Sequence, residues 1–161
     1  WATKPGQCQW MAYGDSVVFH YSHQTGLLEH SFTRLADFSN PPRLISCKDP
    51  LEEEGFRSGI FHLDKTSVVF AASDALSHYV LMMYELSKRS EFEKELMELR
   101  TKPTSNSQLL QMAEKEKFNF YDDVLIPLIR RADSESAFKE LMETLYAKSL
   151  IDIDDYTLAI L

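Results

Sequence analysis

The sequence predicts an α+β fold in which antiparallel strands pack against helices. Strands are expected up to residue 36 and again at 60–74, because short runs there are rich in β-branched and aromatic residues. From residue 75 to residue 149 the apolar residues recur at helical spacing instead. The chain then closes on an apolar, β-prone run at 155–161, which predicts one more strand. Its 161 residues suit a single domain.

The first third divides into three expected strands and a loop. The strands are placed at residues 9–13, 17–21 and 27–32. Residues 37–59 lack periodicity and contain Asn40-Pro41-Pro42 and the acidic run Glu52-Glu53-Glu54, which is typical of a solvated face. A connection of this length exceeds the roughly 12–15 residues of ordinary loops, so we expect it to be functional or mobile.

The clearest strand lies at residues 67–72, where the run is apolar on both faces and therefore central in a sheet. It leads directly into Ser73-Asp74-Ala75, where the apolar spacing changes to that of a helix. Asp74 is therefore expected at a strand end and a helix start. A carboxylate in this place suits a functional acid, and it equally suits a helix cap. His78, one turn later, would face the same region, although packing within the helix is the favoured interpretation.

The helical block is expected to contain several helices after the one that starts at Asp74. They are placed at residues 91–100, 106–117 and 121–131, followed by a last helix capped by Ser134. Pro127 lies inside the third of these segments, so that helix should kink there or begin late. Their apolar stripes are interpreted as packing faces.

Composition and charge exclude several classes of protein. A hydrophobic content of 44% with 26% charged residues is ordinary for a globular domain, and no run approaches the roughly 20 apolar residues that span a bilayer. The net charge of −8 argues against binding to nucleic acid, which depends on cationic side chains. Cys8 and Cys47 are too few for a disulfide scaffold, so we expect reduced thiols in a cytoplasmic protein.

Three aspartates share one context, at a strand end or a tight turn. They are Asp15 in Gly14-Asp15-Ser16, Asp74 after its strand, and Asp154 before the closing strand. Carboxylates at one edge of a sheet can converge although they are far apart in sequence, and Mg²⁺ and Mn²⁺ prefer such oxygen ligands. Taken singly, each aspartate is more typical of a turn or a cap than of a functional site, so the metal interpretation depends on the order and spacing of all three.

Three segments resemble, in order, the type 2C metal-dependent protein phosphatases (PPM-type Ser/Thr phosphatases), in a bacterial-like subfamily. Residues 10–19 resemble the family's Gly-Asp-Ser strand turn, and residues 68–76 its apolar strand that ends in Ser-Asp-Gly. Residues 154–161 resemble its closing Asp-Asn-x-Thr strand. The resemblance covers nearly the whole chain, and the helices between the last two segments match in character only.

The resemblance implies a fold, an activity and a set of site residues. The fold would be the C-terminal half of an α–β–β–α phosphatase sandwich, with residues 37–59 as a flap-like loop. Asp74 and Asp154 match the aspartates that hold a pair of Mg²⁺ or Mn²⁺ ions, and Asp15 matches a ligand of an additional, weaker ion. The implied reaction is the hydrolysis of phosphoserine or phosphothreonine in a phosphoprotein, by metal-activated water. No catalytic side chain besides these metal ligands is expected in this half.

The sequence also departs from the family. Ala75 stands where the family has glycine, whose positive φ is costly for alanine, and bacterial relatives with Asp-Ala-Leu here would make it a trait of a subfamily. Val17 replaces a usual arginine and Asp155 a usual asparagine. The family's N-terminal half, with a further acidic ligand, an Asp-Gly pair and a phosphate-binding arginine, has no counterpart before Asp15.

Two alternatives therefore stay open beside an enzyme completed by the missing half. The first is a phosphatase-like domain without catalysis that serves as a regulatory or binding module. The second is an unrelated α+β domain in which the three matches are accidental. Retention of the three aspartates favours the enzyme, whereas Ala75 and the missing half favour the module.

The resemblance predicts how this 161-residue chain should behave in isolation. Strands whose neighbours belong to the other half present unpaired N–H and C=O groups, which promote association. We expect the chain either to retain that half or to self-associate through the exposed sheet edges, and not to bind a metal pair tightly. Sedimentation combined with mass spectrometry measures this, and a stable monomer without a second peptide would contradict it.

Overall fold

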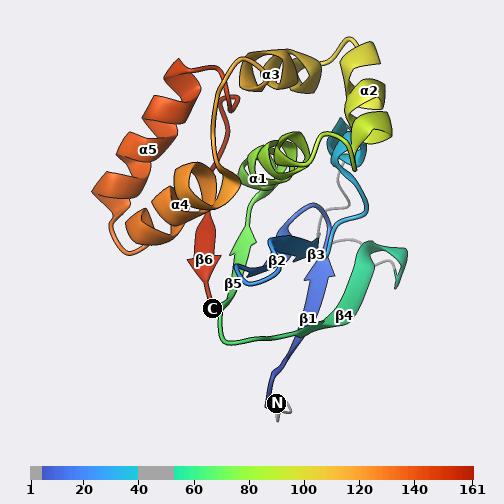
Figure 1. The fold of residues 1–161 in the computed structure, drawn as a ribbon, viewed down its shortest axis with the longest axis vertical. Coiled ribbons are helices and arrows are strands. Elements are labelled where there is room, and N and C mark those ends of the chain that lie inside the picture. Colours follow the sequence, from blue (N-terminus) through green and yellow to red (C-terminus); the bar gives the residue numbers. More distant parts are fainter. Residues whose placement is uncertain (1–4, 40–52) are drawn as a thin grey trace, which may run out of the picture.

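The computed structural model describes residues 5–39 and 53–161, and within them the fold is α+β (Figure 1). The strands are β1 (Gln7–Tyr13), β2 (Val17–Ser22), β3 (Leu27–His30), β4 (Phe56–His62), β5 (Ser67–Ala72) and β6 (Leu158–Ile160). The α-helices are α1 (Asp74–Ser87), α2 (Glu93–Thr101), α3 (Ser105–Ala113), α4 (Ile126–Arg131) and α5 (Glu135–Ala147). Two 3₁₀ turns, η1 (Leu35–Ser39) and η2 (Glu53–Gly55), and a π-helix, η3 (Phe120–Leu125), complete the described elements.

The strands form two antiparallel sheets. Four of them pair in the order β3-β2-β5-β6, and β1 and β4 pair as a separate two-stranded ribbon. In the larger sheet Phe19 lies opposite Phe70, and their rings stack with centroids 4.8 Å apart. Both side chains are fully buried, as expected for the two central strands of a sheet.

The two faces of the four-stranded sheet are covered by different parts of the chain. Phe19 belongs to the core that includes α1, so its face of the sheet lies under the helices. His20, the next residue, points to the opposite face, because side chains alternate along a strand. There its ring lies 5.5 Å from that of Phe61 in β4. The helices and the ribbon therefore cover opposite faces (Figure 1).

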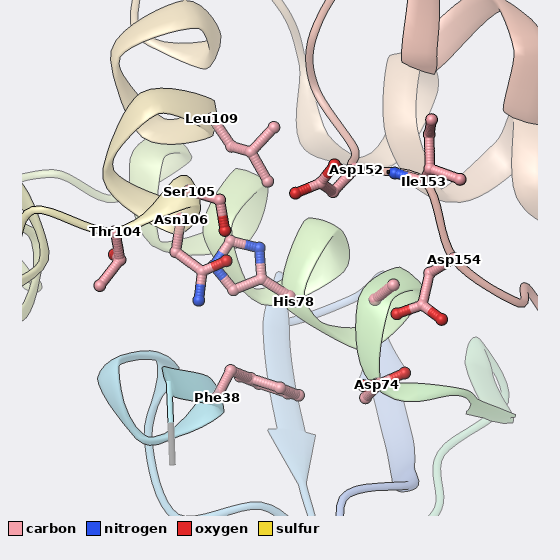
Figure 2. A pocket seen from close by; sticks show the side chains of 11 residues that line it. Phe38, Asp74, His78, Thr104, Ser105, Asn106, Leu109, Asp152, Ile153 and Asp154 are labelled. Atoms are coloured by element: carbon pink, nitrogen blue, oxygen red, sulfur yellow. Dashed lines mark hydrogen bonds between the residues drawn. The ribbon is translucent and has the colours of Figure 1, made fainter. Parts of the chain in front are cut away.

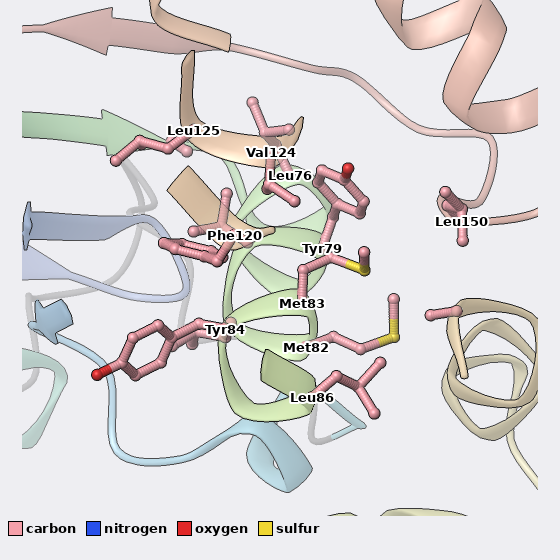
Figure 3. Packing of buried hydrophobic residues seen from close by; sticks show 14 of the residues in the cluster. Leu76, Tyr79, Met82, Met83, Tyr84, Leu86, Phe120, Val124, Leu125 and Leu150 are labelled. Atoms are coloured by element: carbon pink, nitrogen blue, oxygen red, sulfur yellow. The ribbon is translucent and has the colours of Figure 1, made fainter. Parts of the chain in front are cut away.

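Helix α1 is the centre of the helical layer. All eleven of its residues from Leu76 to Leu86 are buried, so it is enclosed on every side (Figure 3). It contacts η1 and η3, and the hydroxyl of Tyr84 accepts a hydrogen bond from the N–H of Leu28 at 3.1 Å. This bond connects the C-terminal part of the helix to the edge strand β3.

The structure confirms the α+β class and most of the expected elements. The sheet runs into a helix at Asp74, and the hydroxyl of Ser134 accepts a hydrogen bond from the N–H of Ala137 at the start of α5. Pro127 is the second residue of α4, so this helix begins late, after a π-helical turn. Helix α3 starts one residue earlier than expected and ends at Ala113.

The expected loop at residues 37–59 is wrong at both ends. Residues 35–39 form η1, and strand β4 begins at Phe56. Residues 56–59 have low strand propensity, and they form a strand because they pair with β1, which is distant in sequence. The two strands pack closely at Gly59, where an added Cβ would lie 2.6 Å from the ring of Trp10. The flap-like segment itself, with Cys47, falls largely in residues 40–52, outside the described residues. Cys8, on β1, is a free thiol.

Within the described part of the chain, no helix combines the length and the apolar character needed to cross a membrane.

Helix α1 contains a buried carboxyl group, that of Glu85, whose ionisation is unfavourable in the folded state. Glu85 is 4% exposed, and its Oε2 has no hydrogen-bond partner. Burial, with the negative charge of Glu95, raises the pKa of Glu85 to about 8 from 4.5. The native state therefore binds this proton more tightly than the unfolded chain does.

We expect the free energy of unfolding to fall as the pH rises from about 4.5 to about 8, because the native state alone keeps Glu85 protonated there. Glu85→Gln, which keeps the shape and removes the ionisation, should flatten this slope and be more stable than the wild type at pH 8. Urea unfolding at a series of pH values measures it. The exposed change Glu140→Gln is the control; an unaltered slope in Glu85→Gln would contradict the assignment.

Candidate functional site

Asp74 stands where strand β5 passes into helix α1. Ser73, between them, has the extended backbone of an N-cap, yet its side chain makes no capping bond. Its hydroxyl donates to the carbonyl of Asp155 at 3.0 Å and accepts from the N–H of Thr157 at 3.1 Å. The N–H of Ser73 also donates to the carbonyl of Thr157. These bonds hold the segment that contains Asp154 against the turn that contains Asp74.

A cavity of about 370 Å³ opens at this junction, between the start of α1, the start of α3 and the segment before β6 (Figure 2). Eleven described residues line it: Phe38, Asp74, Ala75, His78, Thr104, Ser105, Asn106, Leu109, Asp152, Ile153 and Asp154. In Figure 2 the carboxylates of Asp74 and Asp154 lie near one another on one side, and the start of α3 lies on the other. The volume falls in the range of small-ligand sites.

The electrostatics of this cavity are acidic. Burial raises the pKa of Asp74, the negative charges of Asp154 and Asp15 raise it further, and the N–H of Ala75 opposes them. Within the described residues, no lysine or arginine lines the cavity or forms an ion pair with Asp74. Raised pKa values beside like charges mark places where a cation would be stabilised.

Asp15 lies near this cavity and outside its lining. It occupies the turn between β1 and β2, after Gly14, whose φ of 75° suits glycine. Arg57 of β4 donates a hydrogen bond to the carbonyl of Gly14, and the charge of Asp15 opposes the lowering of the Arg57 pKa by burial. Asp15 is thus close enough to affect Asp74, with a basic neighbour of its own.

The structure places Asp74 and Asp154 in the wall of one cavity, although they are far apart in sequence. Asp15 does not line the cavity, but its negative charge raises the pKa of Asp74. Two carboxylates without basic partners are suitable oxygen ligands for Mg²⁺ or Mn²⁺. Across the described residues, however, no three histidine, cysteine or acidic side chains are grouped so as to hold a metal ion. Their role as metal ligands stays a prediction.

Ala75 does not adopt the positive φ that would be costly for alanine at the position where the family has glycine. It lies in the first turn of α1, and it is absent from the described residues with positive φ, among which Ser149 is the non-glycine case. A helical backbone favours alanine over glycine. The replacement is therefore compatible with the local fold.

Thr104 and Asp152, which the sequence analysis did not single out, complete the cavity together with His78, which was expected near Asp74. Thr104 is the N-cap of α3 but makes no capping bond, and its hydroxyl oxygen is buried without a partner among the described residues. The Nε2 atom of His78 is also buried without a partner, and burial lowers the pKa of this imidazole to about 4, so that it is neutral at pH 7. Asp152 lies opposite them. Its only sequence signal is its position two residues before Asp154.

Comparisons with known proteins add no family assignment: models of protein families, curated proteins and solved structures were each searched, and none matches this chain.

The coupling between the two aspartates is directly measurable. Asp154→Asn removes one of the negative charges that raise the pKa of Asp74, so the pKa of Asp74 should fall toward its ordinary value. The carboxyl carbon signals of isotopically labelled protein, followed by NMR as a function of pH, report it. Asp133→Asn, the same change at an exposed residue after α4, should leave Asp74 unaltered. A rise in the Asp74 pKa in Asp154→Asn would contradict the geometry.

Proposed function

We propose that this chain is the C-terminal portion of a metal-dependent phosphoserine/phosphothreonine protein phosphatase of the type 2C family. One observation carries the proposal: Asp74 and Asp154, which the family motifs mark as metal ligands, lie in the wall of one cavity. Accidental matches to short motifs do not require two carboxylates to lie together at the end of a central strand. Ser73 of the same motif forms the bonds that hold them there.

The arrangement of layers supports the same proposal. Helices, a four-stranded sheet and a ribbon lie in succession, which agrees with three layers of an α–β–β–α sandwich. Within the described residues, the outer face of the ribbon exposes three large apolar side chains: Met11 is 62% exposed, Ile60 51% and Phe56 41%. In the family a further helical layer would cover such a face, and burying these side chains would be favourable by roughly 25 cal/mol per Å².

The residues of this chain would have separate roles in metal binding and positioning. Asp74 and Asp154 would hold Mg²⁺ or Mn²⁺ through their carboxylate oxygens, and Ser73 would position them. The bound ions would activate water and stabilise charge on the phosphoryl oxygens. The cavity beside them would admit the phosphorylated side chain. The remaining ligands and a phosphate-binding arginine are proposed to come from the family's N-terminal half.

A non-catalytic phosphatase-like binding module is the second candidate. It is favoured by the absence, within the described residues, of a complete group of metal-binding side chains. The two functions share this fold and differ in whether the acidic cavity holds metal for chemistry. Catalytic activity of the intact protein separates them.

The intact protein should hydrolyse a phosphoserine peptide in the presence of Mn²⁺, and Asp74→Asn should reduce kcat by at least about 100-fold, because a neutral amide is a weaker ligand and changes the charge at the ion. Phosphate release measures it. Asp133→Asn is the matched control, with the same chemical change on the surface.

Hydrolysis that survives Asp74→Asn, or that needs no divalent ion, would refute the assigned role of the aspartate. An intact wild-type protein that is inactive with Mg²⁺ and with Mn²⁺ would instead favour the binding module.

A further inference from the structure

The cavity has a second half that the proposed metal ligands do not use. Asp74 and Asp154 occupy one side, and Thr104, Ser105 and Asp152 surround the other, at the start of α3 (Figure 2). Asp152 accepts a hydrogen bond from the N–H of Ile153 with one carboxylate oxygen. Within the described residues it has no basic partner. Its charge is therefore available to a ligand.

Two buried polar atoms of residues that line the same cavity lack hydrogen-bond partners within the described part of the chain. His78 is 4% exposed, lines the cavity, and has an unpaired Nε2; in Figure 2 its ring extends from α1 toward the start of α3. The hydroxyl oxygen of Thr104 is buried and unpaired as well. A buried polar atom without a hydrogen bond costs about 1–3 kcal/mol, so such atoms are expected to have partners in the functional state.

The charges of the lining residues indicate the chemical class of that partner. Three carboxylates face the cavity, from Asp74, Asp152 and Asp154, and no lysine or arginine is among its described lining residues. An acidic concave surface concentrates cations. A neutral imidazole has one acceptor and one donor nitrogen, and a hydroxyl can accept as well as donate, so both can bind a ligand with N–H donors.

We propose that the α3 side of this cavity binds a cationic amino or guanidino group. Asp152 is its carboxylate partner, and Thr104, Ser105 and His78 accept or share its remaining hydrogen bonds. A charged N–H donor and a carboxylate form the stronger class of hydrogen bond, which fixes the orientation of the bound group.

The identity of the bound cation in the cell rests on the proposed function, whereas the cation site itself does not. If the carboxylates of Asp74 and Asp154 mark the reacting end of the cavity, the bound cation is a lysine or arginine side chain of the phosphoprotein, near the phosphorylated residue. Asp152 then determines specificity and takes no part in the chemistry. The substrate class is a phosphoserine or phosphothreonine peptide with a basic neighbour.

The cation site is tested without any use of phosphatase activity. n-Butylammonium, which mimics a lysine side chain, is titrated into the intact protein in the presence of a chelator, and the imidazole signals of His78 are followed by NMR. They should shift and saturate in the millimolar range, whereas the neutral probe n-butanol should leave them in place. Asp152→Asn should weaken binding at least fivefold, and the surface control Asp133→Asn less than twofold.

Thr104→Val supplies a second variant of nearly unchanged shape. Removing an unpaired buried hydroxyl should raise Tm by a few degrees, while n-butylammonium binds at least threefold more weakly. Thr101→Val is its control, because that hydroxyl is exposed and donates to the carbonyl of Glu98. A gain in stability with a loss of binding separates a ligand-binding hydroxyl from a structural one.

Three results would overturn the inference: n-butanol shifting His78 as much as n-butylammonium, unchanged affinity in Asp152→Asn, or affinity lost in Asp74→Asn and Asp154→Asn alone. A protein that binds n-butylammonium but hydrolyses no phosphopeptide keeps the cation site and loses the proposed function. In an active enzyme, kcat/KM should favour a lysine-containing phosphopeptide about tenfold over its norleucine analogue, and Asp152→Asn should abolish the preference. Equal values in the wild type would overturn the substrate class.

Discussion

The complete burial of helix α1 is the constraint on which this structure depends. A helix that is buried on every side is stable only when other elements enclose it, and here the four-stranded sheet, η1 and η3 do so. Because α1 continues directly from the central strand β5, its first residue is held at the edge of the sheet. Asp74 is therefore placed by a central strand and a buried helix, a rigid position for a functional carboxylate.

Ser73 shows how a residue that ordinarily caps a helix can serve the tertiary structure. Its hydroxyl is committed to the backbone of Asp155 and Thr157, so the first turn of α1 is left without a side-chain cap. Thr104 repeats the pattern at α3, where the hydroxyl remains unpaired beside the cavity. Both helices that border the cavity thus lack a cap of about 1 kcal/mol at the end that faces it. Stability is commonly lower at binding sites for this kind of reason.

Some carboxylates of the protein line the cavity, and others form ion pairs with arginine. Three carboxylates face one cavity, whereas the surface acids Glu98 and Glu114 pair with Arg34 and Arg100. Exposed pairs of this kind contribute little to stability, because water and salt screen them. The carboxylates that line the cavity, which form no ion pair among the described residues, are the ones that the proposed cation would stabilise.

Local patterns in the sequence were sufficient for the α+β class, the strand at 67–72, the helix start at Asp74 and the Ser134 cap. Each depends on neighbours within a few residues: apolar alternation, helical spacing or a side chain that reaches its own helix. The same patterns, with the family resemblance, singled out Asp74 and Asp154. The first part of β4, from Phe56 to Gly59, was predicted as loop because it pairs with a strand more than forty positions earlier, a contact that no local pattern reports.

The composition of the cavity was decided by the tertiary structure alone. His78, Thr104 and Asp152 come from α1, the start of α3 and the segment before β6, and nothing in their sequence spacing predicts that they meet. Their buried, unpaired state likewise depends on which elements pack over them. Sequence by itself determined which residues have suitable chemistry at strand ends. Only the packing of α1, α3 and the closing segment around one space decided which of them act together, because proximity across a fold depends on how whole elements are buried.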